Sequence, residues 1–394
     1  MAELFEGSEL GPIRLKNRFL KAATFEGRAR RGVVSDELIE FHRVMAAGGI
    51  AMTTVAYLAV SSDGRTDRHC ILLSEDSLPG LARLTKAVHD EGALVSAQIG
   101  HAGPVANARS NNAPSLAPSS GFSAMGARLH EVTTAQLDRI VNDYAASSAL
   151  AKEAGFDCIE IHMGHNYLIS SFLSPKLNRR KDEYGGSLEN RARLARRVAR
   201  AVREAVGPDI AVIAKLNLDD GVPGGFGVSE AAEVASWLET DGAINALELT
   251  GGSSLANPMY LFRGDAPREE FAKTLPQPLR LGFKVVGKHF MPSYPFEEAY
   301  FIDQARVVLN QVSLPVILLG GITKPATAQS ALNEGFSFFA LGRPLLMEPS
   351  IVRRWERGDE APSACTHCNK CMPTIYEGTH CVLNGGPLGV SLAD

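Results

Sequence analysis

Short apolar runs rich in β-branched residues recur along the chain, and an amphipathic stretch follows each of them. The runs do not alternate with polar residues, which is the pattern of strands that are buried on both faces. Eight such strands are predicted, at residues 18–23, 49–55, 94–100, 157–162, 211–216, 246–250, 315–320 and 337–342.

The stretches between the runs have the signals of helices. Thr133 and Gln136 form a predicted capping box, in which each side chain satisfies a backbone amide of the other residue, and Gly155 ends that helix. Residues 188–206 place apolar side chains on one face and most of their six arginines on the other, and Gly207 ends this helix. We interpret the arginines as the solvated outer face of a barrel helix rather than as a basic binding stripe.

Eight strand–helix units predict a (β/α)8 TIM barrel of the α/β class rather than an open doubly wound sheet. No G-x-G-x-x-G opens the first unit, and the glycine-rich turns come after the seventh and eighth runs, where such barrels build a phosphate site. We expect the barrel to span residues 1–360, with residues 361–394 as a cysteine-bearing tail that is not an independent domain.

Two long insertions break the regular spacing of the units. They follow the third and the sixth strand, at residues 101–130 and 252–297, and the second is rich in aromatic residues. Excursions at the catalytic end of a barrel tend to carry function, so we expect both insertions to cover the substrate.

Composition and charge exclude several classes of protein. Lys plus Arg number 40 against 44 Asp plus Glu, so the net charge is −4, and no block of like charge would attract nucleic acid or an anionic membrane. No apolar run approaches the ~18 residues of a membrane span, and the first residues lack the features of a signal peptide. We therefore expect a soluble cytoplasmic protein that binds neither nucleic acid nor membrane. The sequence does not decide whether the protein forms a homo-oligomer.

The turns after the last two strands are the first candidate site. Gly320 and Gly321 follow the seventh strand, and Gly342 and Arg343 follow the eighth. Glycine lets backbone amides approach phosphate oxygens closely, and an arginine can pair with the dianion. Tight strand–helix turns alone would also use glycine, but two such turns on adjacent strands predict a phosphorylated ligand.

A second candidate site directly follows the fourth strand. His162, His165 and Tyr167 are close enough in sequence to converge on one small pocket. Neutral imidazoles can polarise a carbonyl group or hold an anion, and a phenol can donate a proton. A metal pair or purely structural histidines are the alternatives, but a third ligand at a familiar spacing is missing.

The same region resembles the Old Yellow Enzyme family, which comprises FMN-dependent ene-reductases and NADH:flavin oxidoreductases. The likeness rests on the run from His162 through residues 168–175 to residues 178–191, and on shorter matches at residues 15–18, 97–103 and 340–344. These segments occur in order over nearly the whole barrel. The resemblance implies bound FMN, NAD(P)H as the reductant and a small-molecule acceptor such as an activated alkene, which receives hydride through the flavin.

The resemblance also implies roles for single residues. Gln98 would bind the pyrimidine edge of the flavin, and Lys215 would lie beside flavin N1 and O2, where the family commonly has arginine. His162 and His165 would lie over the flavin and bind the acceptor, and Tyr167 would donate the proton. The phosphate of FMN would be held by Gly320, Gly321, Gly342 and Arg343.

The chain departs from the family pattern at two flavin-facing positions. The segment Ala23, Thr24 and Phe25 has phenylalanine where the family typically has Thr or Cys, so either Thr24 serves instead or the tuning of the flavin differs. The small residue after the second strand is Ala56, with Tyr57 as the alternative.

Four cysteines near the end of the chain have the spacing C-x2-C-x2-C-x9-C, namely Cys365, Cys368, Cys371 and Cys381. Four thiolates can enclose a [4Fe–4S] cluster or a zinc ion. The position is similar to the iron–sulfur members of the family, trimethylamine dehydrogenase and 2,4-dienoyl-CoA reductase, which have additional dinucleotide-binding domains. The chain ends soon after Cys381, so we expect no such domain. We favour a metal-free or zinc-bound tail over an iron–sulfur cluster that relays electrons to a partner protein.

Three other functions compete with the reductase. An iron–sulfur flavoprotein that dehydrogenates or demethylates its substrate would pass electrons to a partner protein. A flavin-binding barrel without turnover would act as a scaffold, but the retained His162, His165 and Tyr167 argue against it. A flavin-free phosphosugar aldolase or isomerase would need a Schiff-base lysine such as Lys215, and the rest of the site does not fit that chemistry.

Overall fold

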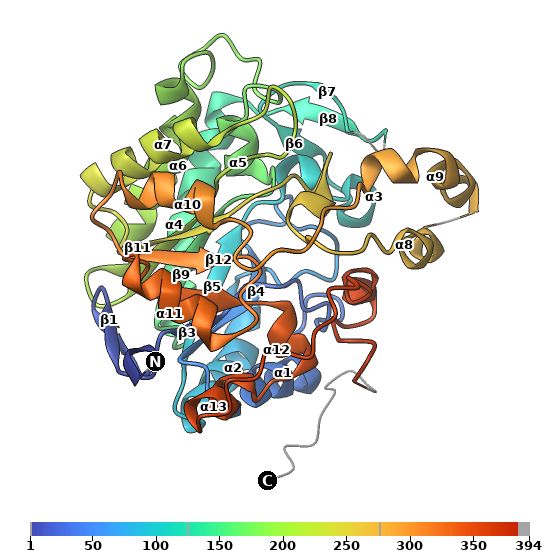
Figure 1. Cartoon of the computed structure of the whole chain (residues 1–394). Coiled ribbons are helices and arrows are strands. Elements are labelled where there is room, and N and C mark those ends of the chain that lie inside the picture. The colour runs from blue at the N-terminus through green and yellow to red at the C-terminus, as the bar shows by residue number, and fades with distance from the viewer. Residues whose placement is uncertain (1, 124–125, 276, 385–394) are drawn as a thin grey trace.

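Eight parallel strands close into a barrel in the computed structural model, which describes residues 2–123, 126–275 and 277–384 (Figure 1). Each predicted run contributes one barrel strand, so the predicted TIM barrel is confirmed. The strands are β3 (Phe19–Lys21), β4 (Met52–Ala59), β5 (Leu94–Gly100), β9 (Cys158–Met163), β10 (Ala211–Asn217), β11 (Ala246–Thr250), β12 (Val316–Leu319) and β13 (Phe338–Leu341).

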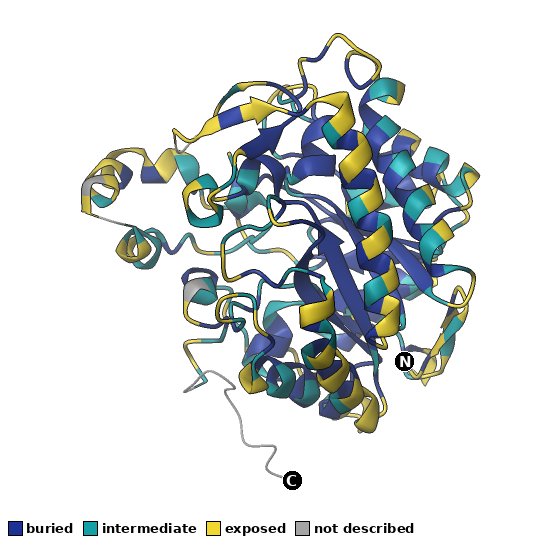
Figure 2. Ribbon diagram, turned by 180° about the vertical axis from the view of Figure 1, so that it is seen from behind, coloured by how far each residue is buried: buried dark blue, intermediate teal, exposed yellow. Residues whose placement is uncertain are grey.

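Helices surround the barrel with one face buried and the other exposed (Figure 2). The capping box is present, because the Thr133 hydroxyl accepts from the Gln136 amide at 3.2 Å and the Gln136 side chain accepts from the Thr133 amide at 2.9 Å. These outer helices are α1 (Asp36–Ala47), α2 (Leu78–Asp90), α4 (Thr134–Glu153), α6 (Leu188–Val206), α7 (Val228–Thr240), α10 (Ile302–Leu309), α11 (Pro325–Asn333) and α13 (Ile351–Glu356).

The arginine-rich helix α6 runs over the predicted residues. Arg196 and Arg200 pair with Asp241 directly after α7, and Arg197 pairs with Asp138 of α4. Arg191 is different, because it is buried and donates to the Leu173 carbonyl and to Glu230. One arginine of the predicted outer face therefore joins α6 to α5 (Leu168–Leu173) and α7.

A hairpin at the N-terminus is a feature that the apolar runs did not predict. Strands β1 (Ser8–Leu10) and β2 (Ile13–Leu15) pair antiparallel, and they follow the short helix η1 (Ala2–Leu4). Leu10 and Leu15 are fully buried in one cluster with residues from the first ends of the barrel strands, such as Ala211. The hairpin therefore closes the end of the barrel opposite the predicted site.

The insertion after β5 folds into a small sheet of its own. Its three strands lie in the order β6-β8-β7, and they are only two to four residues long, which is too short for an alternating pattern to predict them. The elements are η3 (Gly103–Val105), α3 (Ala108–Asn111), β6 (Ser115–Ala117), β7 (Gly121–Phe122) and β8 (Arg128–Glu131), and η2 (Glu75–Ser77) precedes them in the chain.

The insertion after β11 is helical and projects from the barrel at the right of Figure 1. It contains η4 (Pro258–Tyr260), α8 (Arg268–Thr274) and α9 (Gln277–Phe290). Its aromatic residues pack on one another and on Met372 of the C-terminal segment, so the insertion and the tail share one apolar cluster. The tail follows α12 (Arg343–Met347) and α13 and contains η5 (Met372–Tyr376); its last ten positions, 385–394, lie outside the described residues.

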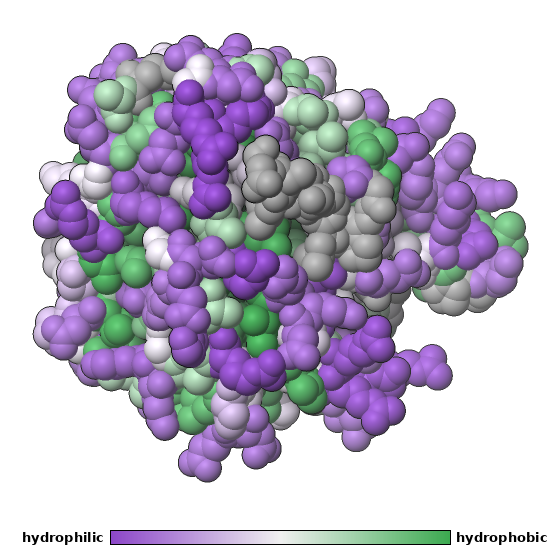
Figure 3. Space-filling model, turned by 90° about the horizontal axis from the view of Figure 1, so that it is seen from below, coloured by the Kyte–Doolittle hydropathy of each residue, from purple (hydrophilic) through white to green (hydrophobic). Residues whose placement is uncertain are grey.

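The surface is mixed in polarity on the face shown in Figure 3, where hydrophobic side chains lie in small separate patches among hydrophilic ones. Among the described helices, none combines the length and the hydropathy that crossing a bilayer requires.

Charged side chains lie inside the barrel. The Lys215 ammonium is paired with Glu248 and lies 3.6 Å from Glu160, and the Glu160 carboxylate accepts from Gln98 at 2.5 Å. On the opposite side Lys21 donates to Glu26 at 2.8 Å. Burial and the neighbouring Glu248 raise the pKa of Glu160 from its usual 4.5 to about 7.

The raised pKa of Glu160 predicts a pH dependence of stability. A carboxyl group with a higher pKa in the folded state stabilises that state when protonated, and this stabilisation is lost as the pH rises through about 7. We therefore expect Glu160→Gln to increase the free energy of unfolding relative to the native sequence at about pH 8.5, with a smaller difference at about pH 5. Urea unfolding followed by circular dichroism measures both.

The exposed Glu204 of α6 provides the matched control. Glu204→Gln removes one surface carboxylate and leaves the charged groups inside the barrel in place, so it is the reference for the loss of one negative charge. A stability difference between Glu160→Gln and this reference that does not change with pH would contradict the assigned titration.

Candidate active site

The turn after β9 brings His162, His165 and Tyr167 together. His165 and Asn166 have φ angles of 59° and 58°, so the chain reverses sharply before α5 begins. The amide of His165 donates to the Asn217 side chain at 3.0 Å, which anchors this turn to β10. The His162 ring centroid lies 5.1 Å from that of His165 and 4.4 Å from that of Tyr167. The three predicted side chains therefore form one cluster at the C-terminal end of the barrel.

Both imidazoles of this cluster are neutral. Burial lowers the pKa of His165 to about 3, and burial together with the nearby His165 and Lys215 lowers that of His162 well below its usual value. The His165 Nε2 atom lies 2.8 Å from the Thr250 hydroxyl, whereas the His162 Nδ1 atom is buried without a hydrogen-bond partner in the described chain. An unsatisfied buried polar atom costs about 1–3 kcal/mol, so His162 presents a nitrogen to which a ligand can hydrogen-bond.

Tyr57 extends the cluster across the mouth of the barrel. Its ring centroid is 5.5 Å from that of Tyr167 at an interplanar angle of 83°, and its hydroxyl donates to the Gly64 carbonyl. A Cβ atom on Gly100 would lie 2.6 Å from the Tyr57 ring, so this glycine is needed for the close approach. Sequence reasoning named Tyr57 only as the alternative to Ala56, and the structure places both in one cluster with Ala23 and Tyr167.

The two side chains that the resemblance assigns to the flavin ring are both held by buried carboxylates. Gln98 donates to Glu160, and Lys215 donates to Glu248. The strand register explains this arrangement, because Gln98 pairs with Glu160 and Lys215 pairs with Glu248 on neighbouring strands. Sequence reasoning missed both glutamates, although a single charge within an otherwise apolar strand is a usable signal.

The segment after β3 lies beside the last glycine turn. The Thr24 hydroxyl is buried and has no hydrogen-bond partner among the described residues. A Cβ atom on Gly342 would have open space around it, with the Thr24 methyl group at 4.0 Å as its neighbour. The backbone carbonyl of Phe25 instead accepts from Thr379 of the tail. Thr24 rather than Phe25 therefore has a polar group available at this edge of the mouth.

The other glycine turn has a backbone conformation and a crowding that only glycine accommodates. Gly320 and Gly321 have φ angles of 106° and 78°, and a Cβ atom on either would collide with the ring of Tyr300. The Arg343 guanidinium donates from Nη1 to the carbonyls of Phe262 and Arg263 and to the Asn369 side chain. Arg343 therefore ties the second insertion to the tail, and its predicted pairing with a phosphate stays a prediction.

These features fit FMN. One side of the mouth has the unpartnered Thr24 hydroxyl, open space at Gly342 and the left-handed pair of Gly320 and Gly321. The buried Lys215 ammonium and Gln98 amide lie inside the barrel. An oxygen-rich phosphate and a flavin ring with a polar edge would satisfy these groups.

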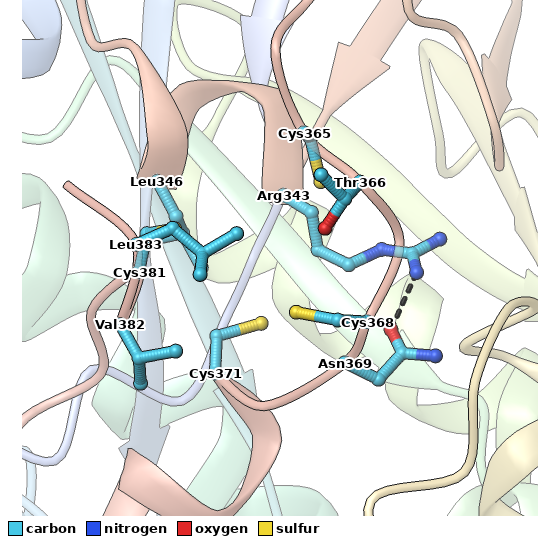
Figure 4. A pocket seen from close by; sticks show the side chains of 10 residues that line it. All are labelled: Arg343, Leu346, Cys365, Thr366, Cys368, Asn369, Cys371, Cys381, Val382 and Leu383. Carbon is cyan, nitrogen blue, oxygen red and sulfur yellow. Dashed lines mark hydrogen bonds between the residues drawn. The ribbon is translucent and has the colours of Figure 1, made fainter.

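The four predicted cysteines line one pocket beside Arg343 and Asn369 (Figure 4). All four are free thiols, and the sulfur atoms of Cys368 and Cys371 are directed toward one another. Burial raises the pKa of Cys371 to about 12. Within the part of the chain that the structure describes, no group of three or more His, Cys, Asp or Glu side chains is arranged to hold a metal ion. The predicted metal therefore stays a prediction.

Known proteins resemble the chain over its whole length. The chain is 52% identical over 382 residues to the 4,4'-dithiodibutanoate disulfide reductase of Rhodococcus erythropolis. The aligned region covers 96% of this chain and 94% of that protein. It is 32% identical over 390 residues to a metal reductase of Desulforamulus reducens and 29% identical over 376 residues to an NADH oxidase of Thermoanaerobacter brockii. The chain spans about half the length of these last two relatives, 54% and 52%.

Solved structures have the same fold at low sequence identity. A 2-naphthoyl-CoA reductase in complex with 2-naphthoyl-CoA superposes with a TM-score of 0.84 at 23% identity, over 98% of this chain and 57% of that one. Morphinone reductase in complex with tetrahydroNAD superposes with a TM-score of 0.72 at 22% identity, over 92% of each chain.

A family model extends this likeness to the site. The model described as the NADH:flavin oxidoreductase / NADH oxidase family matches residues 3–250, which include β3 to β11 and the cluster of His162, His165 and Tyr167. This family uses FMN and a reduced nicotinamide, as the resemblance in the sequence had implied. The chain belongs to the NADH:flavin oxidoreductase / NADH oxidase family, and it is a flavin-dependent NAD(P)H oxidoreductase.

Proposed function

We propose that this enzyme reduces small organic disulfides that carry carboxylate groups, with NAD(P)H as the electron donor. The relative that is 52% identical over nearly its full length is named for a disulfide with two terminal carboxylates. The observation that carries the proposal is the pair of neutral imidazoles beside Tyr167, with the His162 Nδ1 atom unpartnered. Such a site donates hydrogen bonds to an atom that gains negative charge.

The cofactor would be held by residues from several strands. Backbone amides at Gly320, Gly321 and Gly342 would contact the phosphate, and Thr24 would hydrogen-bond at the adjoining edge. Gln98 and Lys215 would contact the polar edge of the ring, with Ala23 and Ala56 lining it. When bound, FMN supplies two-electron chemistry, taking hydride from NAD(P)H and reducing the acceptor.

The residues of the chain then have separate tasks in disulfide reduction. NAD(P)H supplies a hydride, which is equivalent to two electrons and one proton, and solvent supplies a second proton. The two electrons break the sulfur–sulfur bond, and the two protons convert both sulfur atoms to thiols. His162 and His165 would donate hydrogen bonds to the developing thiolate, and Tyr167 would deliver the solvent-derived proton. The charge of Lys215 would stabilise negative charge on the ring that it contacts.

Activated alkenes are the second candidate acceptors. The same two imidazoles are suited to polarise a carbonyl oxygen, and Tyr167 lies beside them to protonate the alkene carbon. The neutral state of both rings supports this chemistry as well, because a neutral imidazole donates one hydrogen bond without bringing a full charge into the pocket.

The cysteine pocket is a proposed metal site. Cys365, Cys368, Cys371 and Cys381 supply four sulfur donors, the set that zinc and [4Fe–4S] clusters use. Metal binding requires deprotonated thiols, and the positive charge of Arg343 lowers the pKa of Cys371 against the effect of burial.

The central test uses the purified protein under anaerobic conditions. We expect yellow protein that is bleached by NADH or NADPH and is then reoxidised by 4,4'-dithiodibutanoate, with two thiols formed for each nicotinamide consumed. Absorbance of the flavin and a thiol assay measure the two sides. Reoxidation by 2-cyclohexenone but not by the disulfide would assign the enzyme to alkenes, and colourless protein that takes up no FMN would refute the site itself.

The imidazole pair can be tested separately from the cofactor. We expect the double variant His162→Ala and His165→Ala to retain FMN and to lose affinity for phenolic or enone ligands by about 10- to 100-fold, because two hydrogen bonds to the ligand are removed. Titration of the oxidised flavin with 4-hydroxybenzaldehyde measures this affinity. Release of FMN from the double variant would assign the histidines to cofactor binding instead.

The tail makes a prediction about elemental content. Anaerobically purified protein is expected to contain about one zinc or about four iron atoms per chain, the content of the two sites that four thiolates form. Cys368→Ser and Cys371→Ser are expected to lower that content while FMN remains bound. Neither metal in the native protein would remove the metal hypothesis, and Cys70→Ser is the control for the loss of a buried thiol elsewhere.

A further inference from the structure

The second insertion holds one arginine among three tyrosine rings. The guanidinium carbon of Arg263 lies 4.8 Å from the ring centroids of Tyr260 and Tyr294 and 5.7 Å from that of Tyr300. We call these four residues the arginine cage. The cage is rigid, because each tyrosine hydroxyl is used: Tyr260 bonds to Gln304, Tyr294 accepts from Asn257, and Tyr300 donates to the Leu261 carbonyl.

The Arg263 side chain lacks an acceptor. Among the described residues none accepts a hydrogen bond from its guanidinium or forms an ion pair with it, and its Nε atom is buried and unsatisfied. A guanidinium carries five N–H donors in its plane and accepts no hydrogen bond. Such a fork matches a carboxylate or a phosphate, which accepts two parallel hydrogen bonds.

A second cation lies next to the cage. The Arg343 guanidinium donates to the backbone carbonyl of Arg263 at 2.8 Å, and it too forms no ion pair within the described part of the chain. Two uncompensated positive charges in one region attract an anion more strongly than one does.

The cage belongs to the insertion whose first residues contact the proposed active site. The Ser254 amide, at the start of the same insertion, donates to the His165 carbonyl at 3.2 Å. The Tyr260 ring lies against Gly221 in the loop after β10, since a Cβ atom there would be 2.6 Å from it. The cage therefore stands at the C-terminal end of β10 to β12, on the segment that leads away from His165.

Tyr300 separates the cage from the glycine turn assigned to the phosphate of FMN. Cβ atoms on Gly320 and Gly321 would meet opposite edges of the Tyr300 ring, so this turn lies across one face of the ring. The Tyr300 ring therefore contacts both the glycine turn and the Arg263 guanidinium. The FMN content of an Arg263 variant distinguishes a role in binding the acceptor from a role in binding the cofactor phosphate.

We propose that Arg263 binds the carboxylate of the acceptor and so selects acidic substrates over neutral ones. The inference rests on the proposed function, since it assumes that the acceptor occupies the site beside His162 and His165. The three tyrosines act as positioning residues that hold the guanidinium, while Arg263 itself contacts the substrate.

The test compares an acidic and a neutral acceptor that share the same dithiodibutanoyl skeleton. For Arg263→Gln we expect KM for 4,4'-dithiodibutanoate to rise by about 10- to 100-fold, with KM for its dimethyl ester and the FMN content unchanged. Arg263→Lys is expected to recover part of the loss, because lysine keeps the charge without the fork. Arg268→Gln is the matched control, since its guanidinium in the same insertion is already bonded to Met291 and Ser293.

A binding measurement keeps this test independent of turnover. Butanoate titrated against oxidised protein, followed by flavin absorbance, is expected to bind the native protein more tightly than the Arg263→Gln variant. Equal binding would overturn the proposal, as would an equal rise in KM for acid and ester. Loss of FMN from the variant would instead assign Arg263 to the cofactor phosphate. A native enzyme that reduces neither disulfide would refute the proposed function, and the butanoate titration would still decide the role of Arg263.

Discussion

Parallel pairing of the last barrel strand with the first is the constraint on which the rest of the molecule depends. β13 pairs with β3 through Phe339 to Leu341, and this pairing converts a row of eight strands into a closed ring. Because all eight strands are parallel, their C-terminal ends emerge on one side. Residues more than 300 positions apart, such as Thr24 and Gly342, become neighbours there. A break in this closure would separate the two edges of the proposed flavin site.

Closure also creates an interior that must hold charge. Lys215, Glu160 and Glu248 point into the ring, where an isolated charge would be strongly unfavourable. Lys215 is shared by two carboxylates on the neighbouring strands, since it is paired with Glu248 and lies 3.6 Å from Glu160, and these contacts also fix the orientation of its side chain. The same arrangement holds Gln98 through Glu160. The groups assigned to the flavin ring are therefore preorganised by strand register rather than by flexible loops.

The insertion after β11 and the C-terminal tail form a second layer over this end of the barrel. They share an apolar cluster, and Arg343 hydrogen-bonds to both of them. His367 of the tail stacks on Phe296 of the insertion with ring centroids 3.4 Å apart. The cysteine pocket and the arginine cage thus belong to one connected structure.

The sequence by itself determined the barrel and most of the candidate site. Unbroken apolar runs can be buried only as strands covered on both faces, and the eight barrel strands follow those runs within a few residues. The cluster of His162, His165 and Tyr167 was predictable because its members lie within six residues and a tight turn suffices to join them. Tertiary structure decided the rest. It pairs Gln98 and Lys215 with buried glutamates, places Thr24 opposite Gly342 and surrounds Arg263 with tyrosines. These contacts join segments far apart in the chain, and the register and loop packing that create them leave no periodic signal in the sequence.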